Sequence, residues 1–260
     1  MGLLTNKRGL VMGVANERSI AWGIAKALHE AGAELAFTYQ SDAFGKRLEP
    51  LAASVRSDFM VNADVTDDVS LDRAFDQLAK RWPQIDFVVH AIAFSDKDEL
   101  TGRFLQTSRE NFKNYISAYS FIEVARRAHP LMVKNGGSLI TLTYQGSNKV
   151  TPFYNVMGVA KAALESTTRY LASDLGPEGI RVNAISPGPM KTLAGAAIGG
   201  ARKTYKFTDQ NAPLQSNATL EAVGGTAVYL IGDAGACTTG EIIHVDGGYH
   251  VMGMPRVENI

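Results

Sequence analysis

Short apolar segments alternate along the chain with longer segments whose apolar residues recur at helical spacing. In one of the longer segments, Leu71, Ala74, Phe75 and Leu78 fall on a single helical face. Strands are predicted over residues 10–13, 34–39, 58–62, 85–90, 138–143, 181–186 and 241–245. Helices are predicted over residues 19–31, 43–55, 71–82, 108–133 and 153–174.

This alternation predicts an α/β fold. Strands that are apolar throughout and separated by helices indicate a parallel sheet covered on both faces. Right-handed crossovers between such strands give a doubly wound, Rossmann-like sheet, which binds its ligand beside the carboxyl ends of the strands. No repeat, low-complexity stretch or linker interrupts the sequence, so residues 1–260 are predicted to form a single domain.

The least regular segment covers about residues 187–217. It follows a predicted strand and carries Gly188, Gly195, Gly199 and Gly200. A long segment of small residues at a strand end is typical of a mobile loop over a substrate. A short amphipathic helix packed on the domain explains its apolar residues equally well.

Composition narrows the function classes. Lys and Arg total 26, as do Asp and Glu, and this balance argues against a nucleic acid partner. The one cysteine, Cys237, is expected in or near the core, and the five histidines lack metal-ligand spacing, so we expect no metal. The apolar stretch near the N-terminus is too short for a signal peptide, and no window is long enough to span a membrane. We therefore expect a cytoplasmic protein.

The turn after the first predicted strand is a candidate phosphate site. A strand that ends at Gly13 and a helix that begins near Ser19 would aim backbone N–H groups at a pyrophosphate. The sequence between them departs from the usual G-x-G-x-x-G pattern, because Ser19 and Ala21 occupy glycine places. A plain tight turn fits this segment equally well.

The ends of the second and third strands favour NADH over NADPH. Gln40 holds the position that reads the adenosine ribose, and Asp42 nearby would repel a 2′-phosphate. Lys46 and Arg47 follow about a turn later and are interpreted as a solvated helix face. Asp64 and Val65 are placed to meet the adenine, although Asp64 could equally be the N-cap of the next helix.

A tyrosine and a lysine form the strongest local pattern. Tyr154 and Lys161 are seven residues apart, which is two helical turns, so both project from one face of the predicted helix. A nearby ammonium would stabilise the phenolate of Tyr154 and lower the pKa of its phenol. The same lysine could donate to the ribose hydroxyls of a nicotinamide cofactor.

With these motifs in place, the chain resembles the short-chain dehydrogenases/reductases over its whole length. It is most similar to the NADH-dependent enoyl-(acyl-carrier-protein) reductases of bacteria. The matching segments are residues 13–23 (GVANERSIAWG), 38–40 (TYQ), 64–65 (DV), 90–94 (HAIAF), Tyr144, 154–161 (YNVMGVAK), 176–186 (GPEGIRVNAIS), 192–194 (TLA) and 240–248 (GEIIHVDGG).

The resemblance implies roles for particular residues. The implied catalytic residues are Tyr154, Lys161 and Tyr144. The implied NADH-binding residues are Gly13, Ser19, Ile20, Gln40, Asp64, Val65, Ile92, Lys161 and Thr192. The implied substrate-binding residues are Ala93, Tyr144, Tyr154, Met190 and Ala194, with Leu193, Ala196 and Ile198 of the same loop. The family also implies a homotetramer, in which residues 247–260 pack against a neighbouring subunit.

The spacing between Tyr154 and Lys161 favours enoyl reduction over ketone reduction. Ketone-reducing relatives carry the pattern Tyr-x-x-x-Lys, which is shorter than the spacing of seven in this chain. They also carry a serine at the end of the fifth strand, where this chain has Tyr144 after Thr143. In enoyl reduction, hydride reaches C3 while charge builds on the thioester oxygen farther away, so the acid must lie farther from the nicotinamide. A ketoreductase or alcohol dehydrogenase on the same fold, and a non-catalytic dinucleotide-binding module, are the alternatives.

The chain also departs from the family, and two of the departures bear on the site. Ala93 stands where members usually carry glycine, and its methyl group would narrow the pocket beside the nicotinamide. Gln215 and Ser216 replace basic residues of the family. Other basic side chains would therefore have to bind an acidic carrier protein. The candidates are Lys191, Arg202, Lys203 and Lys206.

Overall fold

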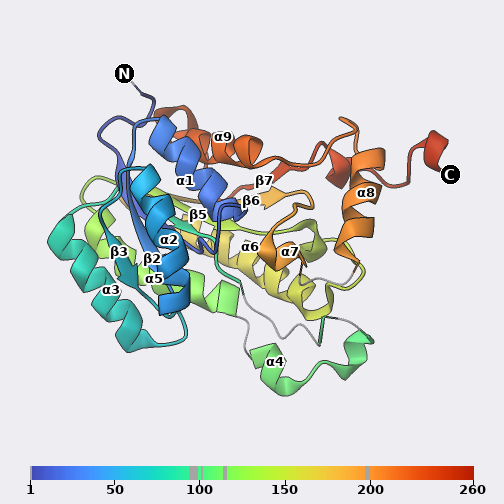
Figure 1. The fold of residues 1–260 in the computed structure, drawn as a ribbon, viewed down its shortest axis with the longest axis horizontal. Helices are drawn as coiled ribbons and strands as arrows, with labels where there is room; N and C mark the ends of the chain where they lie inside the picture. Colours follow the sequence, from blue (N-terminus) through green and yellow to red (C-terminus); the bar gives the residue numbers. More distant parts are fainter. Residues whose placement is uncertain (1, 94–98, 101, 114–115, 197–199) are drawn as a thin grey trace.

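One parallel sheet organises the molecule, and the strand order confirms the predicted doubly wound fold (Figure 1). The computed structural model describes residues 2–93, 99–100, 102–113, 116–196 and 200–260. Within them, seven strands pair in the order β3-β2-β1-β4-β5-β6-β7. The strands are β1 (Arg8–Met12), β2 (Glu34–Tyr39), β3 (Met60–Asn62), β4 (Phe87–His90), β5 (Gly137–Leu142), β6 (Ile180–Pro187) and β7 (Ile242–Val245).

Helices cover both faces of this sheet (Figure 1). The α-helices are α1 (Ile20–Glu30), α2 (Asp42–Ser54), α3 (Asp68–Arg81), α4 (Arg109–Lys113), α5 (Ile116–Met132), α6 (Asn155–Leu175), α7 (Leu193–Ala196), α8 (Ala201–Asn211) and α9 (Leu220–Ile231). Short 3-10 helices are η2 (Phe104–Gln106), η3 (Gln145–Ser147), η4 (Gly176–Glu178), η5 (Asp233–Gly235), η6 (Tyr249–Val251) and η7 (Val257–Asn259).

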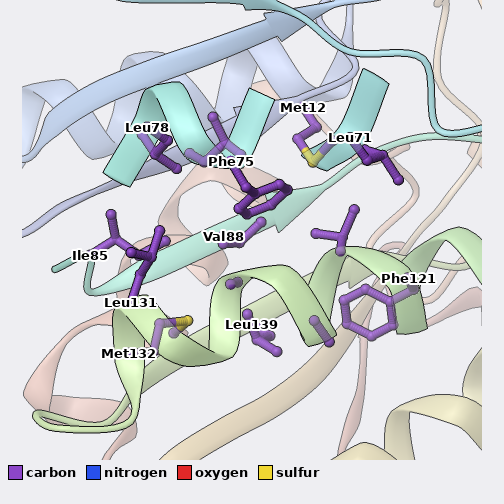
Figure 2. Close-up of a cluster of buried hydrophobic side chains, with 14 of the residues drawn as sticks. Met12, Leu71, Phe75, Leu78, Ile85, Val88, Phe121, Leu131, Met132 and Leu139 are labelled. Carbon is purple, nitrogen blue, oxygen red and sulfur yellow. The ribbon is translucent and has the colours of Figure 1, made fainter. Parts of the chain in front are cut away.

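Alternate residues of each strand enter different hydrophobic clusters. In β1, Leu10 and Met12 pack with α3, α5 and α6, whereas Val11 between them packs with α1, α2 and α9. Figure 2 shows the first cluster, where Phe75 of α3 and Phe121 of α5 lie on the same side of the sheet as Val88. Each buried side chain of this kind contributes about 1.5–3 kcal/mol, so the two layers fix the sheet between them.

The strand order reverses direction between β1 and β4, which pair in parallel with Met12 opposite His90. Crossovers from β1 lead outward through β2 to β3, and those from β4 lead outward through β5 to β7. Ligands of doubly wound sheets bind outside the carboxyl ends of the strands at such a reversal. The fold therefore places a site beyond Met12 and His90.

The sequence patterns miss helix α9. Its centre holds Gly224 and Gly225, and glycine disfavours a helix interior. In the fold, a Cβ on Gly224 would lie 2.6 Å from the Cβ of Ala27, and one on Gly23 would lie 2.7 Å from the Cβ of Leu220. Glycine at these positions lets α1 and α9 approach closely, so it reflects helix packing and not a loop.

Other predicted segments also differ. The segment 187–217 contains α7 and α8, so the described part of it is largely helical; Ile198 lies outside the described residues. The helix predicted over 108–133 corresponds to α4 and α5, and residues 114–115 lie outside the described residues. Cys237 is exposed, because it lies on the surface connection between η5 and β7 and not in the core.

No helix in the described part of the chain is long and apolar enough to cross a membrane.

Candidate active site

The turn from β1 into α1 forms the floor of the first cavity. Gly13 adopts a left-handed backbone with φ of 96°, and a Cβ there would lie 2.1 Å from the carbonyl oxygen of Ala91. The Ser19 hydroxyl accepts hydrogen bonds from the backbone N–H groups of Ala15 and Asn16, at 3.0 and 3.1 Å. Ser19 thus closes the turn at the point where α1 begins, and the first N–H groups of that helix lie beside the cavity.

The ends of β2 and β3 are joined by side-chain hydrogen bonds. The Gln40 amide donates to the Asp64 carboxylate over 3.3 Å, and the Asn62 amide donates to the Gln40 carbonyl oxygen over 3.0 Å. Burial raises the pKa of Asp64, but hydrogen bonds from Thr66 and Gln40 outweigh it and lower that pKa. The N-cap of α3 is Asp67, whose carboxylate accepts from the Val69 N–H, so the N-cap interpretation of Asp64 is wrong.

The first cavity has a volume of about 500 Å³ and runs along the carboxyl ends of β1, β2 and β4. It is large enough for a cofactor or drug-sized ligand. Of the residues that the sequence assigns to NADH, it is lined by Gly13, Ser19, Ile20, Gln40, Val65, Ile92, Lys161 and Thr192. Asp64 is not part of the lining, and it reaches the cavity through its hydrogen bond to Gln40.

A second cavity of about 440 Å³ adjoins the first. Its walls include Tyr144, Tyr154 and Met190, together with apolar residues of α6 and of the segment after β6. Five of the described residues line both cavities, and they mark the junction: Ile20, Ala93, Leu142, Lys161 and Thr192. A ligand in the first cavity therefore meets a ligand in the second beside Lys161.

Tyr154 lies at the start of α6 with its ring in the second cavity. Its neighbours Phe153 and Asn155 both have left-handed backbone, with φ of 62° and 30°. Such backbone strain in residues other than glycine is typical of positions that functional sites hold in place. The rings of Tyr154 and Tyr144 meet edge to face, with centroids 5.0 Å apart.

The prediction that Lys161 lowers the pKa of the Tyr154 phenol is wrong. Burial raises the pKa of Tyr154 far above its ordinary value, and Tyr144 and Glu165 raise it further. The reason is geometric, since the phenol is 6% exposed and the Lys161 ammonium donates to the Leu142 carbonyl oxygen at 2.8 Å. Tyr154 therefore remains protonated at neutral pH and can act as a hydrogen-bond donor.

Lys161 is buried at the junction of the two cavities. Burial lowers the pKa of its ammonium to about 8, and the charge of Glu165 acts in the opposite direction. His90 of β4 is also buried, and burial followed by the charge of Lys161 lowers the pKa of His90 to about 3. Its ring, which lies 3.1 Å from the Thr141 hydroxyl and 2.9 Å from the Ser120 hydroxyl, is therefore neutral.

Sequence reasoning missed several lining residues. Phe44 and Thr66 line the first cavity, and Leu100 and Met157 line the second. Phe44 lies four residues after Gln40 at the start of α2, a position that could have suggested it. Of the residues expected near the substrate, Ala194 belongs to α7, while Ile198 lies outside the described residues.

The first cavity fits a nicotinamide dinucleotide. Gly13, Ala15 and Ser19 line it at the start of α1, where backbone N–H groups can bind a pyrophosphate. The Gln40–Asp64 pair presents polar groups where an adenosine ribose would lie, and no Lys or Arg other than Lys161 lines the described part of the cavity. In the described residues, no group of three or more His, Cys, Asp or Glu side chains is placed to hold a metal ion.

Comparison with known proteins agrees with this geometry. The model of the enoyl-(acyl carrier protein) reductase family matches residues 13–250. The enoyl-(acyl-carrier-protein) reductase (NADH) 1 of Rhizobium meliloti is 58% identical over 259 residues, which cover 99% of this chain and 95% of the relative. The corresponding NADH enzyme of Rickettsia conorii is 51% identical, covering 98% of this chain and 99% of the relative.

A solved structure gives the same result. The enoyl-(acyl-carrier-protein) reductase of Anaplasma phagocytophilum, crystallised in complex with NAD, superposes with a TM-score of 0.95. It is 52% identical in sequence, and the match covers 98% of each chain. Family model, relatives and fold all agree with the resemblance seen in the sequence, and this chain belongs to the enoyl-(acyl carrier protein) reductase family.

Proposed function

We propose that this protein reduces the trans-2 double bond of an enoyl thioester carried by acyl carrier protein, with NADH as the reductant. The observation that supports this proposal most strongly is the junction at Lys161. There, a cavity suited to a dinucleotide opens into an apolar cavity with two tyrosines. The family and the NADH-dependent relatives support the same reaction. The product is the saturated acyl thioester of fatty-acid elongation.

Residues of the first cavity would hold the cofactor. Backbone N–H groups at the start of α1, beside Gly13, would bind the pyrophosphate, and Gln40 would bind the adenosine ribose. Lys161, Ile20 and Thr192 line the junction and would hold the nicotinamide end. When bound, the reduced nicotinamide supplies the hydride that reduces C3 of the substrate.

Tyr154 supplies the hydrogen bond that the substrate needs. It lines the second cavity but not the first, whereas Lys161 lines both, so its hydroxyl lies on the substrate side of the junction. Reduction at C3 places negative charge on the thioester oxygen, three bonds away, and a donor there stabilises the enolate. Because burial keeps the pKa of Tyr154 high, the phenol carries the proton needed for this role. Tyr144 packs against it edge to face and limits its movement.

The acyl chain would lie under the segment of residues 187–217. Met190, Gly195 and Thr204 of this segment line the second cavity, opposite Tyr154 and Met157. An apolar wall of this kind suits a fatty chain. We propose that residues 1–260 act as one domain in which this segment is the substrate-binding element. Arg202, Lys203 and Lys206 are exposed on α8 and would meet an acidic carrier protein there.

We also propose a cytoplasmic homotetramer. Val251, Met254, Val257 and Ile260 are exposed, large and apolar, and they lie together in the last twelve residues. Exposed apolar groups of this kind are typical of subunit contacts. Sedimentation measures the assembly, and a monomer at micromolar concentration would contradict it.

A substrate comparison tests the reaction. NADH oxidation is followed by absorbance with crotonyl-CoA and, in parallel, with acetoacetyl-CoA. We expect turnover of the enoyl thioester and at most trace turnover of the ketone. Preferred reduction of acetoacetyl-CoA would establish a ketoreductase, and NADH binding without any turnover would indicate a dinucleotide-binding module.

A further inference from the structure

A buried carboxylate lies behind the proposed site. Glu165 is 4% exposed and lies on α6 four residues after Lys161, which is 6% exposed. Residues four apart share a helix face, so both side chains point toward the end of β5. Burying a carboxylate is costly unless other groups compensate for its charge. Neither the reaction nor cofactor binding as described above accounts for this residue.

Two hydrogen bonds connect Glu165 and Lys161 to adjacent residues at the end of β5. The Thr143 hydroxyl donates to the Glu165 carboxylate over 2.7 Å. The Lys161 ammonium donates to the carbonyl oxygen of Leu142, the residue before Thr143, over 2.8 Å. The same two residues of α6 thus hold the end of β5, immediately before Tyr144 enters the second cavity.

Among the residues that the structure describes, few groups can balance the charge of Lys161. His90 faces it from β4 and is neutral. Tyr154, which lines the second cavity together with Lys161, stays protonated because burial raises its pKa. On the other side of Glu165, burial and then His250 lower the pKa of His244 of β7, so that ring is neutral at pH 7. The carboxylate of Glu165 therefore supplies the negative charge that opposes the effect of burial on Lys161.

We propose that Glu165 is a positioning residue, whose charge keeps Lys161 an ammonium at working pH and whose bond to Thr143 fixes the strand end on which Lys161 rests. The proposal rests on the proposed role of Lys161 at the junction. An ammonium can donate to two partners at once, to Leu142 and to a ribose hydroxyl, whereas a neutral amine is a weaker donor. Loss of the Glu165 charge would therefore act through Lys161, without removing any group that touches the substrate.

The test is the pH profile of kcat/KM for crotonyl-CoA with NADH in Glu165→Gln. Glutamine keeps an oxygen that accepts from Thr143 and removes only the charge. The charge of Glu165 raises the pKa of the Lys161 ammonium. Removing a nearby opposite charge of this kind lowers the pKa of an ammonium by about one unit, so we expect the alkaline limb to move to lower pH by that amount. Activity should fall about fivefold at pH 8 and stay near wild type at pH 6. The matched control Asp174→Asn, on the exposed side of α6, should leave the limb in place.

An unshifted limb in Glu165→Gln, or an equal loss of activity at every pH, would overturn the proposal. Glu165→Asp provides a second variant if glutamine prevents folding. It withdraws the charge by one methylene group, so the limb should move in the same direction by less, and an unmoved limb would again overturn the inference. The variant Lys161→Met separates the proposed role of Lys161 from that of Glu165. Full turnover in Lys161→Met would contradict the role of Lys161 itself. An inactive Lys161→Met, combined with an unshifted alkaline limb in Glu165→Gln, would contradict only the role of Glu165.

Discussion

Gly146 of η3 lies against the ring of Tyr154: a Cβ built on Gly146 would stand 2.5 Å from the Cδ1 atom of that ring. The ring therefore occupies space that any other residue at 146 would need. Gly158 of α6 lies close to Gly146, because a Cβ built on Gly158 would stand 2.7 Å from the carbonyl oxygen of Gly146. Two glycines thus let η3 rest on α6 and fix where the phenol of Tyr154 lies.

Gly146→Ala should reduce turnover without abolishing cofactor binding. The added methyl group must push the Tyr154 ring aside, and a displacement of about 1 Å at a reacting group costs about 100-fold in rate. We expect kcat with crotonyl-CoA to fall by about that factor, while the Kd for NADH, measured by fluorescence, stays near wild type. Gly176→Ala is the matched control, because a Cβ there meets nothing within 4 Å. Wild-type kcat in Gly146→Ala would contradict the placement of Tyr154.

Gly13→Ala should weaken NADH binding and destabilise the fold. A left-handed alanine costs about 1–3 kcal/mol, and the close contact with Ala91 adds to that cost. We expect a lower Tm and a Kd for NADH raised at least about tenfold. Gly225→Ala is the control: it lies inside α9 with nothing within 4 Å, so alanine should stabilise the protein by about 0.5–1 kcal/mol. Unchanged NADH affinity in Gly13→Ala would place the pyrophosphate elsewhere.

Gln40→Arg should shift the cofactor preference toward NADPH. The wild-type cavity presents an amide bonded to a carboxylate where a 2′-phosphate would lie, so we expect a strong preference for NADH. A new guanidinium could bind the phosphate, and a charge-assisted hydrogen bond contributes about 1.5–3 kcal/mol, or about tenfold or more in kcat/KM for NADPH. Gln77→Arg, on the exposed surface of α3, is the control for added charge. Equal use of NADH and NADPH by the wild type would contradict this account of the adenosine end.

The alkaline limb of the pH profile should report Lys161. Burial lowers the pKa of this ammonium to about 8, so its charge is present below pH 8 and is lost as the pH rises through that value. We expect kcat/KM to decline above pH 8 in the wild type. In Lys161→Arg the guanidinium stays charged, so the limb should move out of the measurable range even if the rate is lower. A limb that remains near pH 8 in Lys161→Arg belongs to another group.

The sequence was sufficient for the doubly wound parallel fold and for most of the predicted residues that line the first cavity. Apolar strands alternating with helices leave few topologies, and the residues at strand ends, such as Gln40 and Val65, necessarily meet at one edge. Local patterns failed where tertiary contacts decide. Gly224 argued against α9 until the close packing on Ala27 explained it.

The protonation states of the buried site residues could not be predicted from the sequence either. The spacing of Tyr154 and Lys161 predicted that they share one helix face, and both line the second cavity, but it also suggested a lowered pKa for the phenol, which is raised instead. That direction depends on burial and on where the Lys161 ammonium donates, and neither can be deduced from spacing. Glu165 follows Lys161 by one helical turn in the sequence, yet only the contact with Thr143 distinguishes it from a solvated acid.

The hydroxyl of Tyr154 is the group on which the proposed chemistry depends most directly. Tyr154→Phe removes that single oxygen and leaves the ring against Tyr144 and Gly146. Tyr170→Phe, on the same helix but 78% exposed, is the matched control. The decisive measurement is kcat/KM for crotonyl-CoA with saturating NADH. Loss of about 100- to 1,000-fold in Tyr154→Phe, with wild-type turnover in Tyr170→Phe, is expected for the removal of one donor to the enolate oxygen; undiminished turnover in Tyr154→Phe would contradict the account.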